Sequence, residues 1–211
     1  MKPGAIIYND LFTIYPYENQ MFVVKMSGRE IKDYLEVSYA QWINTLTPAQ
    51  LSRPISDASP ALLKIVNHPD PRTSRQSWSF QNRSYNFDSA AGINYTVDVT
   101  KPSGERISIS SMADGAVFDF AREYNVAMTS YRACGGGGLL HAIGIDTSDI
   151  DSRIVARLPE YRNILYSYLQ SHPVLTSEEL GDTSVTGTWK FVPEKQVGPF
   201  LSNDMCRLFG E

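Results

Sequence analysis

A strict alternation of apolar and polar residues at positions 93–100 constrains the fold more than any other feature of the sequence. The apolar positions are Ile93, Tyr95, Val97 and Val99, with a polar residue after each. A period of two residues is typical of a strand that buries one face. Turn-forming residues follow at 101–104, and a second strand begins at Ile107. The sequence therefore predicts an antiparallel hairpin here.

The other periodic segments predict helices and further strands. Residues 27–30 fit a capping box, and apolar residues behind it recur at helical spacing, so we expect a helix over 28–44. The apolar run at 21–26 is typical of a strand covered on both faces. We also expect a strand over 124–131, a helix over 151–172 and a short strand over 189–193. Together these elements indicate a mixed α/β fold, in which helices cover a largely antiparallel sheet.

Chain length sets the expected domain organisation. With 211 residues, 42% of them apolar, the chain suits one globular domain spanning residues 1–211. Residues 45–78 differ from the rest because five prolines interrupt Ser- and Thr-rich sequence. We expect this segment to be a Pro/Ser-rich insertion or lid within the domain, since it offers few apolar residues to bury.

Composition and hydropathy argue against polymeric nucleic acid as a partner and against a transmembrane segment. The net charge is −4 and Lys and Arg form no block, so polymeric nucleic acid is not an expected partner. No apolar run reaches the roughly 20 residues needed to cross a bilayer, and we expect no transmembrane segment. The two cysteines, Cys134 and Cys206, are expected to be free thiols.

Known catalytic motifs are missing from the sequence. The three histidines, His68, His141 and His172, have no metal-ligand spacing. There is no G-x-S-x-G elbow, and the glycines at 135–138 are not followed by the Lys-Ser or Lys-Thr of a phosphate-binding loop. We therefore predict no catalytic residue, no metal ligand and no cofactor held by this chain.

The glycine run still has two interpretations. Four residues without Cβ, placed just after an apolar strand, suit either a tight turn or a backbone cradle for a ligand. In the second case Tyr131 and Arg132 would lie beside the ligand, and an aromatic ring can stack on a planar base. Tyr17, directly after Pro16, is a second loop aromatic that suits either simple packing or stacking.

Four blocks of sequence, in order, resemble the C-terminal domain of the 5′-nucleotidase family. The first runs from residue 4 to residue 36 and includes Pro16-Tyr17-Glu18-Asn19. The others are 85–88, 104–107, and 124–127 continuing into the glycines. The family includes periplasmic UDP-sugar hydrolases and 2′,3′-cyclic-nucleotide phosphodiesterases, and the resemblance covers nearly the whole chain outside 45–78.

The resemblance implies a role in holding nucleosides or nucleotides. In the family this domain grips the nucleoside between two aromatic rings, while a separate metallophosphatase domain holds two metal ions and hydrolyses the ester. Matched by position, Tyr17 and Tyr131 would be the two stacking residues and Asn19 a polar contact to base or ribose. The remaining binding residues implied by the match are Arg132, Gly135, Gly136 and Gly137.

The chain also departs from the family pattern. Gly137 stands where the family usually has a ligand-contacting Asp, and the Asn-Gly-Gly-x-Arg block that would precede Met1 is not in the sequence. Three arginines of the 45–78 segment are candidates to reach a phosphate instead: Arg53, Arg72 and Arg75.

The metal motifs of the family have no counterpart here. Zn, Mn or Mg ions are therefore expected on a metallophosphatase domain or subunit, which would be the chain's protein partner. This chain alone would be inactive. Family members are typically exported, which implies a periplasmic or cell-surface location. A non-catalytic nucleoside-binding or interaction module that has lost the chemistry is the alternative function, and a purely structural domain is a third.

Overall fold

The computed structural model describes residues 4–56, 58–69, 71–72, 76–172, 174–176 and 187–210. The fold is mixed α/β with mostly antiparallel strands, as predicted. The chain divides into two compact units. Unit 1 comprises Met1–Ser27 and Ala121–Asp182, and unit 2 comprises Gly28–Phe120 and Thr183–Glu211.

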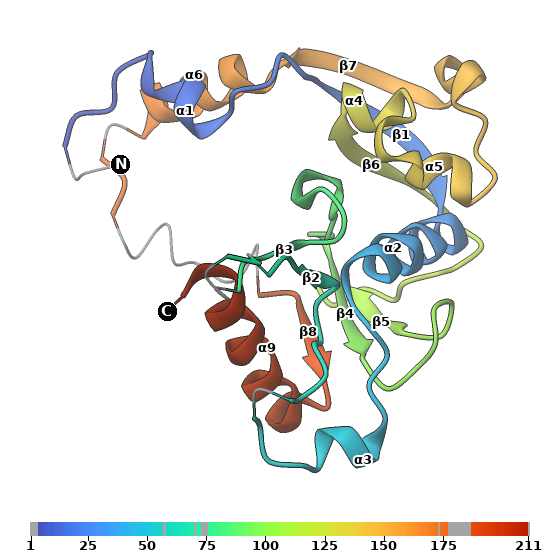
Figure 1. Ribbon diagram of the computed structural model, residues 1–211. Coiled ribbons are helices and arrows are strands. Elements are labelled where there is room, and N and C mark those ends of the chain that lie inside the picture. Colours follow the sequence, from blue (N-terminus) through green and yellow to red (C-terminus); the bar gives the residue numbers. More distant parts are fainter. Residues whose placement is uncertain are drawn as a thin grey trace. The chain divides into compact units, whose positions relative to one another are not determined.

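Unit 1 is built on a three-stranded antiparallel sheet. Strand β1 (Gln20–Ser27) lies between β6 (Glu123–Thr129) and β7 (Ile154–Glu160) (Figure 1). On β1, Phe22, Val24 and Met26 are buried, whereas Lys25 between them is exposed. The expectation that this strand is covered on both faces is therefore wrong, because the strand buries alternate side chains only.

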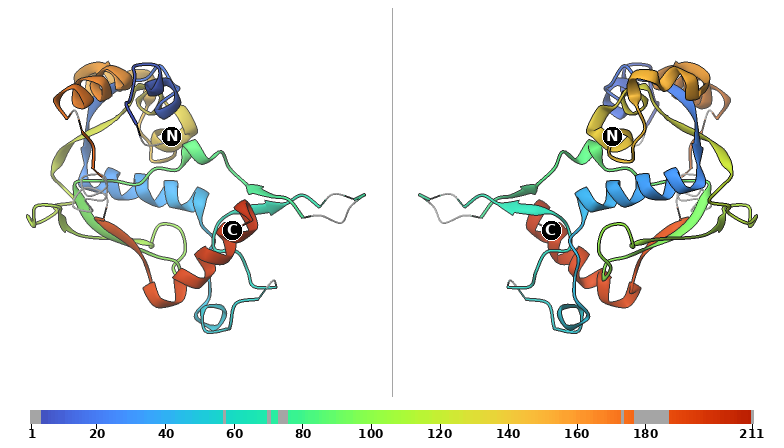
Figure 2. Two further views of the ribbon diagram at one scale, coloured as in Figure 1. Left: turned by 90° about the vertical axis from the view of Figure 1, so that its left-hand side faces the viewer. Right: turned by 90° about the vertical axis from the view of Figure 1, so that its right-hand side faces the viewer.

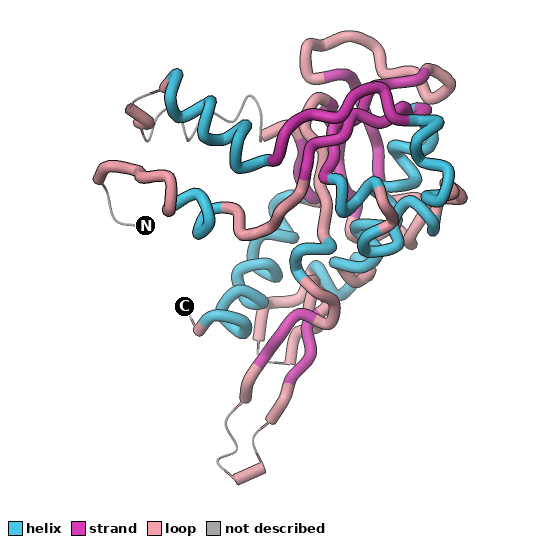
Figure 3. Tube along the Cα trace, turned by 90° about the horizontal axis from the view of Figure 1, so that it is seen from above, coloured by secondary structure: helices cyan, strands magenta, loops and turns pink. Residues whose placement is uncertain are grey.

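Short helices follow β6 and supply buried residues to unit 1. They are α4 (Ser130–Ala133), η2 (Gly136–Gly138), α5 (Leu139–Ala142) and η3 (Thr147–Arg153). Their buried apolar residues include Leu139, Leu140 and Ile150. Two further helices, α1 (Asp10–Ile14) and α6 (Tyr161–Ser171), lie side by side in unit 1 (Figure 3).

Two predicted boundaries in unit 1 are wrong. The expected helix over 151–172 begins only at Tyr161, because residues 154–160 pair with β1 as β7. Pro159 is accommodated there since β7 is an edge strand with a register shift at this point. The strand expected over 124–131 ends at Thr129, whose hydroxyl caps α4 by accepting the N–H of Arg132 at 3.1 Å.

Unit 2 contains the predicted hairpin. Strand β4 (Ile93–Asp98) pairs antiparallel with β5 (Ile107–Met112) and parallel with β8 (Trp189–Val192). The alternate residues Ile93, Tyr95 and Val97 are buried, as the period of two predicts. Helix α2 (Gly28–Trp42) confirms the helix expected over 28–44, and α9 (Glu194–Phe209) follows β8.

Buried polar groups join α2 to the β4–β5 hairpin. The Glu36 carboxylate accepts the backbone N–H groups of Gly104 at 2.9 Å and Ile107 at 2.8 Å. Arg106, also buried, donates to the carbonyl of Lys101 and the hydroxyl of Thr45. Burial lowers the pKa of the Arg106 guanidinium. These bonds satisfy charges that would otherwise be costly inside the unit.

The 45–78 segment belongs to unit 2 and contributes to its core. It contains α3 (Pro48–Leu51) and β2 (Ile65–Asn67), which pairs with β3 (Trp78–Phe80) in a ribbon that extends from this unit (Figure 2). A short helix, η1 (Ser84–Asn86), follows. Four leucines of the segment are buried: Leu46, Leu51, Leu62 and Leu63. The segment thus buries more apolar side chains than its composition indicates.

Cys134 and Cys206 are exposed free thiols, as predicted. Among the described residues, no helix is both long and apolar enough to cross a membrane.

Candidate functional site

The candidate site lies in unit 1, at the end of the sheet where β1 begins and where β6 and β7 end. Gln20 begins β1, Thr129 ends β6 and Glu160 ends β7. In the antiparallel register Met21 faces Thr129, and Gln20 faces Glu160. The segments before β1, after β6 and after β7 therefore leave the sheet at one end. A hydrogen bond of 3.1 Å from the Gln20 N–H to Ser130 Oγ joins the first two segments.

The loop before β1 carries Tyr17 and Asn19. The Tyr17 side chain is 50% exposed. Its backbone carbonyl accepts a hydrogen bond from Arg162 Nη1 at 3.1 Å, and the Asn19 carbonyl accepts the N–H of Tyr161 at 2.9 Å. The first two residues of α6 therefore hold the backbone of this loop.

Arg162 is a site-adjacent residue that the sequence reasoning missed. It is only 5% exposed, and its Nη2 lies 3.2 Å from Glu160 Oε2 and 3.7 Å from Glu18 Oε1. Its guanidinium carbon lies 4.5 Å from the centre of the Phe12 ring. In the sequence, Arg162 is an arginine within an apolar pattern of helical spacing. An exposed arginine on the surface of a helix gives the same pattern, so the sequence did not identify it.

The Asn19 side chain has a protein partner in this structure. Its Nδ2 donates to the Tyr15 hydroxyl at 3.0 Å. The Tyr15 ring is stacked on Tyr161, with centroids 5.2 Å apart, and meets Tyr17 edge-to-face at 5.9 Å. These contacts orient the amide of Asn19 and the ring of Tyr17 from one side.

The segment after β6 forms a tight turn through the glycine run. Gly135 (φ 93°) and Gly137 (φ 74°) adopt left-handed backbone conformations that favour glycine. Gly136 has a different role, because a Cβ there would stand 2.5 Å from ring atoms of Tyr131, so the glycine lets this ring lie against the backbone. The turn interpretation of the glycine run is therefore confirmed, and the ligand-cradle interpretation stays a prediction.

Tyr131 and Arg132 lie on helix α4 rather than on the predicted strand. The Tyr131 side chain is 42% exposed, whereas Arg132 is 4% exposed. Arg132 Nη1 donates to the Gly136 carbonyl at 2.7 Å, and its guanidinium carbon lies 5.5 Å from the centre of the Tyr131 ring. Arg132 therefore supports the glycine turn, and its contact with a ligand stays a prediction.

All seven residues expected to bind substrate belong to unit 1, on two segments that leave the same end of the sheet. The structure describes two of the three candidate phosphate-binding arginines. Arg53 and Arg72 are exposed residues of unit 2, and Arg75 lies outside the described residues.

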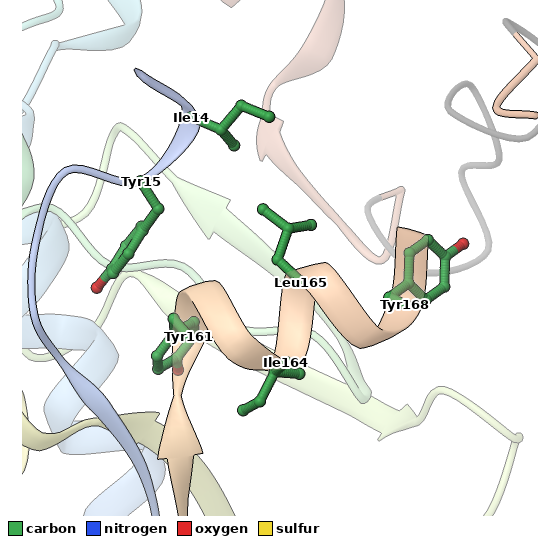
Figure 4. A pocket seen from close by; sticks show the side chains of 6 residues that line it. All are labelled: Ile14, Tyr15, Tyr161, Ile164, Leu165 and Tyr168. Carbon is green, nitrogen blue, oxygen red and sulfur yellow. The ribbon is translucent and has the colours of Figure 1, made fainter. Parts of the chain in front are cut away.

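A hollow of about 320 Å³ lies beside the Tyr17 loop (Figure 4). Its six lining residues come from the end of α1 and from α6: Ile14, Tyr15, Tyr161, Ile164, Leu165 and Tyr168. Tyr15 and Tyr161 thus line the hollow and also contact the loop.

The described residues do not fit a metal ion. No group of three or more His, Cys, Asp or Glu side chains in the described ranges is arranged to hold one.

Comparison with known proteins gives several relatives. An alignment over 178 residues, which covers 79% of this chain, is 30% identical to the trifunctional nucleotide phosphoesterase YfkN of Bacillus subtilis. An alignment over 207 residues, which covers 92% of the chain, is 29% identical to a 2′,3′-cyclic-nucleotide 2′-phosphodiesterase/3′-nucleotidase of Haemophilus influenzae. The matches cover only 10% and 26% of these two proteins. The chain therefore corresponds to a small part of much longer relatives.

Solved structures share the fold. A candidate 5′-nucleotidase from Staphylococcus aureus superposes with a TM-score of 0.53 at 21% identity, over 86% of this chain and 29% of that one. A 5′-nucleotidase precursor from Thermus thermophilus gives 0.51 at 16% identity, over 90% and 28%. The family model described as 5′-nucleotidase, C-terminal domain, matches residues 1–143. With this match over more than half of its length, the chain belongs to the family of 5′-nucleotidase C-terminal domains.

Proposed function

We propose that this chain is the nucleoside- or nucleotide-binding part of a 5′-nucleotidase-type phosphohydrolase. Tyr17 and Tyr131 stack on opposite faces of the base, and Asn19 contacts the base or the ribose. Arg132 and the backbone of Gly135–Gly137 complete the binding surface. The phosphate is presented to a metallophosphatase domain or subunit, in a periplasmic or cell-surface setting.

One structural observation carries this proposal. The antiparallel pairing of β1 with β6 places the Tyr17–Asn19 loop and the Tyr131–Gly137 segment at the same end of the sheet, linked by the Gln20–Ser130 hydrogen bond. Tyr17 and Tyr131 are both about half exposed as residues, so each has surface available for a ligand. The relatives are a nucleotide phosphoesterase and a cyclic-nucleotide phosphodiesterase/3′-nucleotidase, which agrees with this ligand class.

In this proposal, this chain binds the nucleotide and the metal-bearing partner hydrolyses the ester. Stacking on an aromatic ring contributes about 1–3 kcal/mol per base and requires no positive surface, which suits a chain of net charge −4. Two divalent metal ions on the partner would activate water and stabilise the charge on the transferring phosphoryl group. This chain's residues bind and orient the nucleotide, which lowers the barrier once the phosphate lies at the metal centre.

Calorimetric titration of the whole chain with adenosine and with AMP tests the proposal. We expect binding by the wild type, and a loss of about 5- to 150-fold in affinity for Tyr17→Ala and for Tyr131→Ala, the range that corresponds to one stacking contact. Tyr85→Ala is the matched control, because Tyr85 is equally exposed but belongs to unit 2. Wild-type affinity in both site variants would contradict the stacking role and favour a non-catalytic interaction module.

A second measurement tests the division of labour. The purified chain is expected to release no phosphate from AMP in the presence of Mn²⁺, Zn²⁺ or Co²⁺, since its described residues supply no metal-ligand set. Metal-dependent phosphate release that increases with the concentration of this chain would contradict the proposal.

A further inference from the structure

Arg162 is a buried arginine to which the proposed function assigns no role. It stands at the second position of α6. Its two terminal nitrogens have different partners: Nη1 donates to the Tyr17 carbonyl, and Nη2 donates to Glu160. The Phe12 ring lies against the guanidinium. A buried arginine is costly unless all of these contacts are made together.

The residue that Arg162 holds needs such support. Tyr17 lies in a loop of irregular structure between α1 and β1, and its side chain is half exposed. A mobile loop would sample many positions, and only the fraction with the ring correctly placed could bind a base. The hydrogen bond to the Tyr17 backbone restricts the loop before any ligand arrives, which reduces the entropy lost on binding.

We propose that Arg162 is the positioning residue of the nucleoside site: it acts through the Tyr17 carbonyl and keeps the Tyr17 ring in the stacking position. This inference rests on the proposed function. A planar guanidinium is required because it donates in two directions at once, to the loop and to Glu160, whereas a lysine ammonium is a compact point charge without this fork. Arg162 itself needs no contact with the nucleoside.

Nucleoside affinity of Arg162 variants provides the test. Arg162→Met removes both donors, and we expect adenosine affinity to fall roughly tenfold, as it would if only about a tenth of the molecules kept the loop in place. Arg162→Lys should recover part of this loss. The matched control is Arg157→Met on β7, where the guanidinium contacts Asp151 and the ring of Phe22; its affinity should stay within about twofold of the wild type.

A double-mutant cycle separates positioning from a general structural role. If Arg162 acts through Tyr17, Arg162→Met has no further effect on affinity in the Tyr17→Ala background. It keeps its full effect in the Tyr131→Ala background. Equal losses in both backgrounds, or no loss in the single variant, would overturn the inference. If Tyr17→Ala alone leaves affinity unchanged, the proposed function fails as well, so the two failures are distinguishable.

Hydrogen exchange gives a readout that needs no ligand. Arg162→Met should increase amide exchange in residues 15–19 and leave exchange in β1 and β6 unchanged. If this variant does not fold, two milder variants should show the same local increase: Arg162→Lys, which removes the fork but keeps the charge, and Glu160→Gln, which weakens the arm to Glu160. Unchanged exchange at 15–19 in every folded variant, or an increase spread over the whole of unit 1, would contradict the positioning role.

Discussion

The ring of Tyr131 lies against Gly136 so closely that a Cβ at Gly136 would stand 2.5 Å from three of its atoms. Gly136 itself does not have a left-handed backbone, so alanine is conformationally allowed there. Gly136→Ala should therefore displace the flexible Tyr131 side chain and leave the backbone in place. We expect adenosine affinity, measured by calorimetry, to fall at least about fivefold, the lower value for losing one stacked ring.

Thermal unfolding distinguishes this effect from general damage. Gly136→Ala should unfold close to the wild-type temperature, because a ring at the end of a side chain can move at little cost. Gly198→Ala in α9 is the matched control, since a Cβ there meets nothing within 4 Å. It should bind adenosine as the wild type does. Wild-type affinity in Gly136→Ala would show that the position of the Tyr131 ring does not matter for binding.

Elements with a strong local period were predictable from the sequence. The β4–β5 hairpin and α2 follow patterns that neighbouring residues define by themselves. The error at residues 154–160 has a different origin. This segment is a strand because it pairs with β1, about 130 residues earlier in the chain, as in the pairing of Arg157 with Phe22. The pattern of apolar residues within a segment contains no information about such a distant pairing partner.

The candidate site was predictable only in part. Tyr17 stands outside the periodic patterns and Tyr131 lies just before the glycine run, which makes both visible in the sequence. Arg162 could not be found in this way, because its acceptor is a backbone carbonyl 145 residues away. The buried position of Arg132 depends on the Thr129 cap, which turns the chain from strand to helix and directs the guanidinium to the Gly136 carbonyl.

The left-handed backbone at Gly137 (φ 74°) leads to a second prediction. The resemblance described above implies an aspartate at this position, and Asp tolerates this conformation better than most residues. Gly137→Asp should therefore fold, with a modest loss of stability. It should bind adenosine roughly tenfold more tightly, because a hydrogen bond to a charged group contributes about 1.5–3 kcal/mol. Calorimetry measures this change.

Gly137→Ala separates the carboxylate from the backbone strain. It carries the same left-handed conformation without the added acceptor, so it should lose stability and show no gain in affinity. Equal adenosine affinities for the alanine and aspartate variants would mean that position 137 makes no side-chain contact with the ligand.

The fully buried carboxyl of Asp204 in α9 makes the stability of unit 2 depend on pH. Asp204 Oδ2 accepts the N–H of Leu63 at 2.8 Å, and Oδ1 lies 3.3 Å from Arg207. Burial outweighs these contacts and raises the pKa of Asp204 above its ordinary value of 3.8. Between the unfolded and the folded pKa, the native state therefore binds more protons than the unfolded state does.

Stability of the wild type relative to Asp204→Asn should consequently be highest at low pH and fall as pH rises through the raised pKa of Asp204. Urea unfolding followed by tryptophan fluorescence measures this, because Trp42, Trp78 and Trp189 all lie in unit 2. Glu194→Gln is the matched comparison. Hydrogen bonding to Lys190 lowers the pKa of Glu194, so stability relative to that variant should rise with pH. If the free energy of unfolding of the wild type, relative to that of Asp204→Asn, increases as pH rises from about 4, the raised pKa of Asp204 is contradicted.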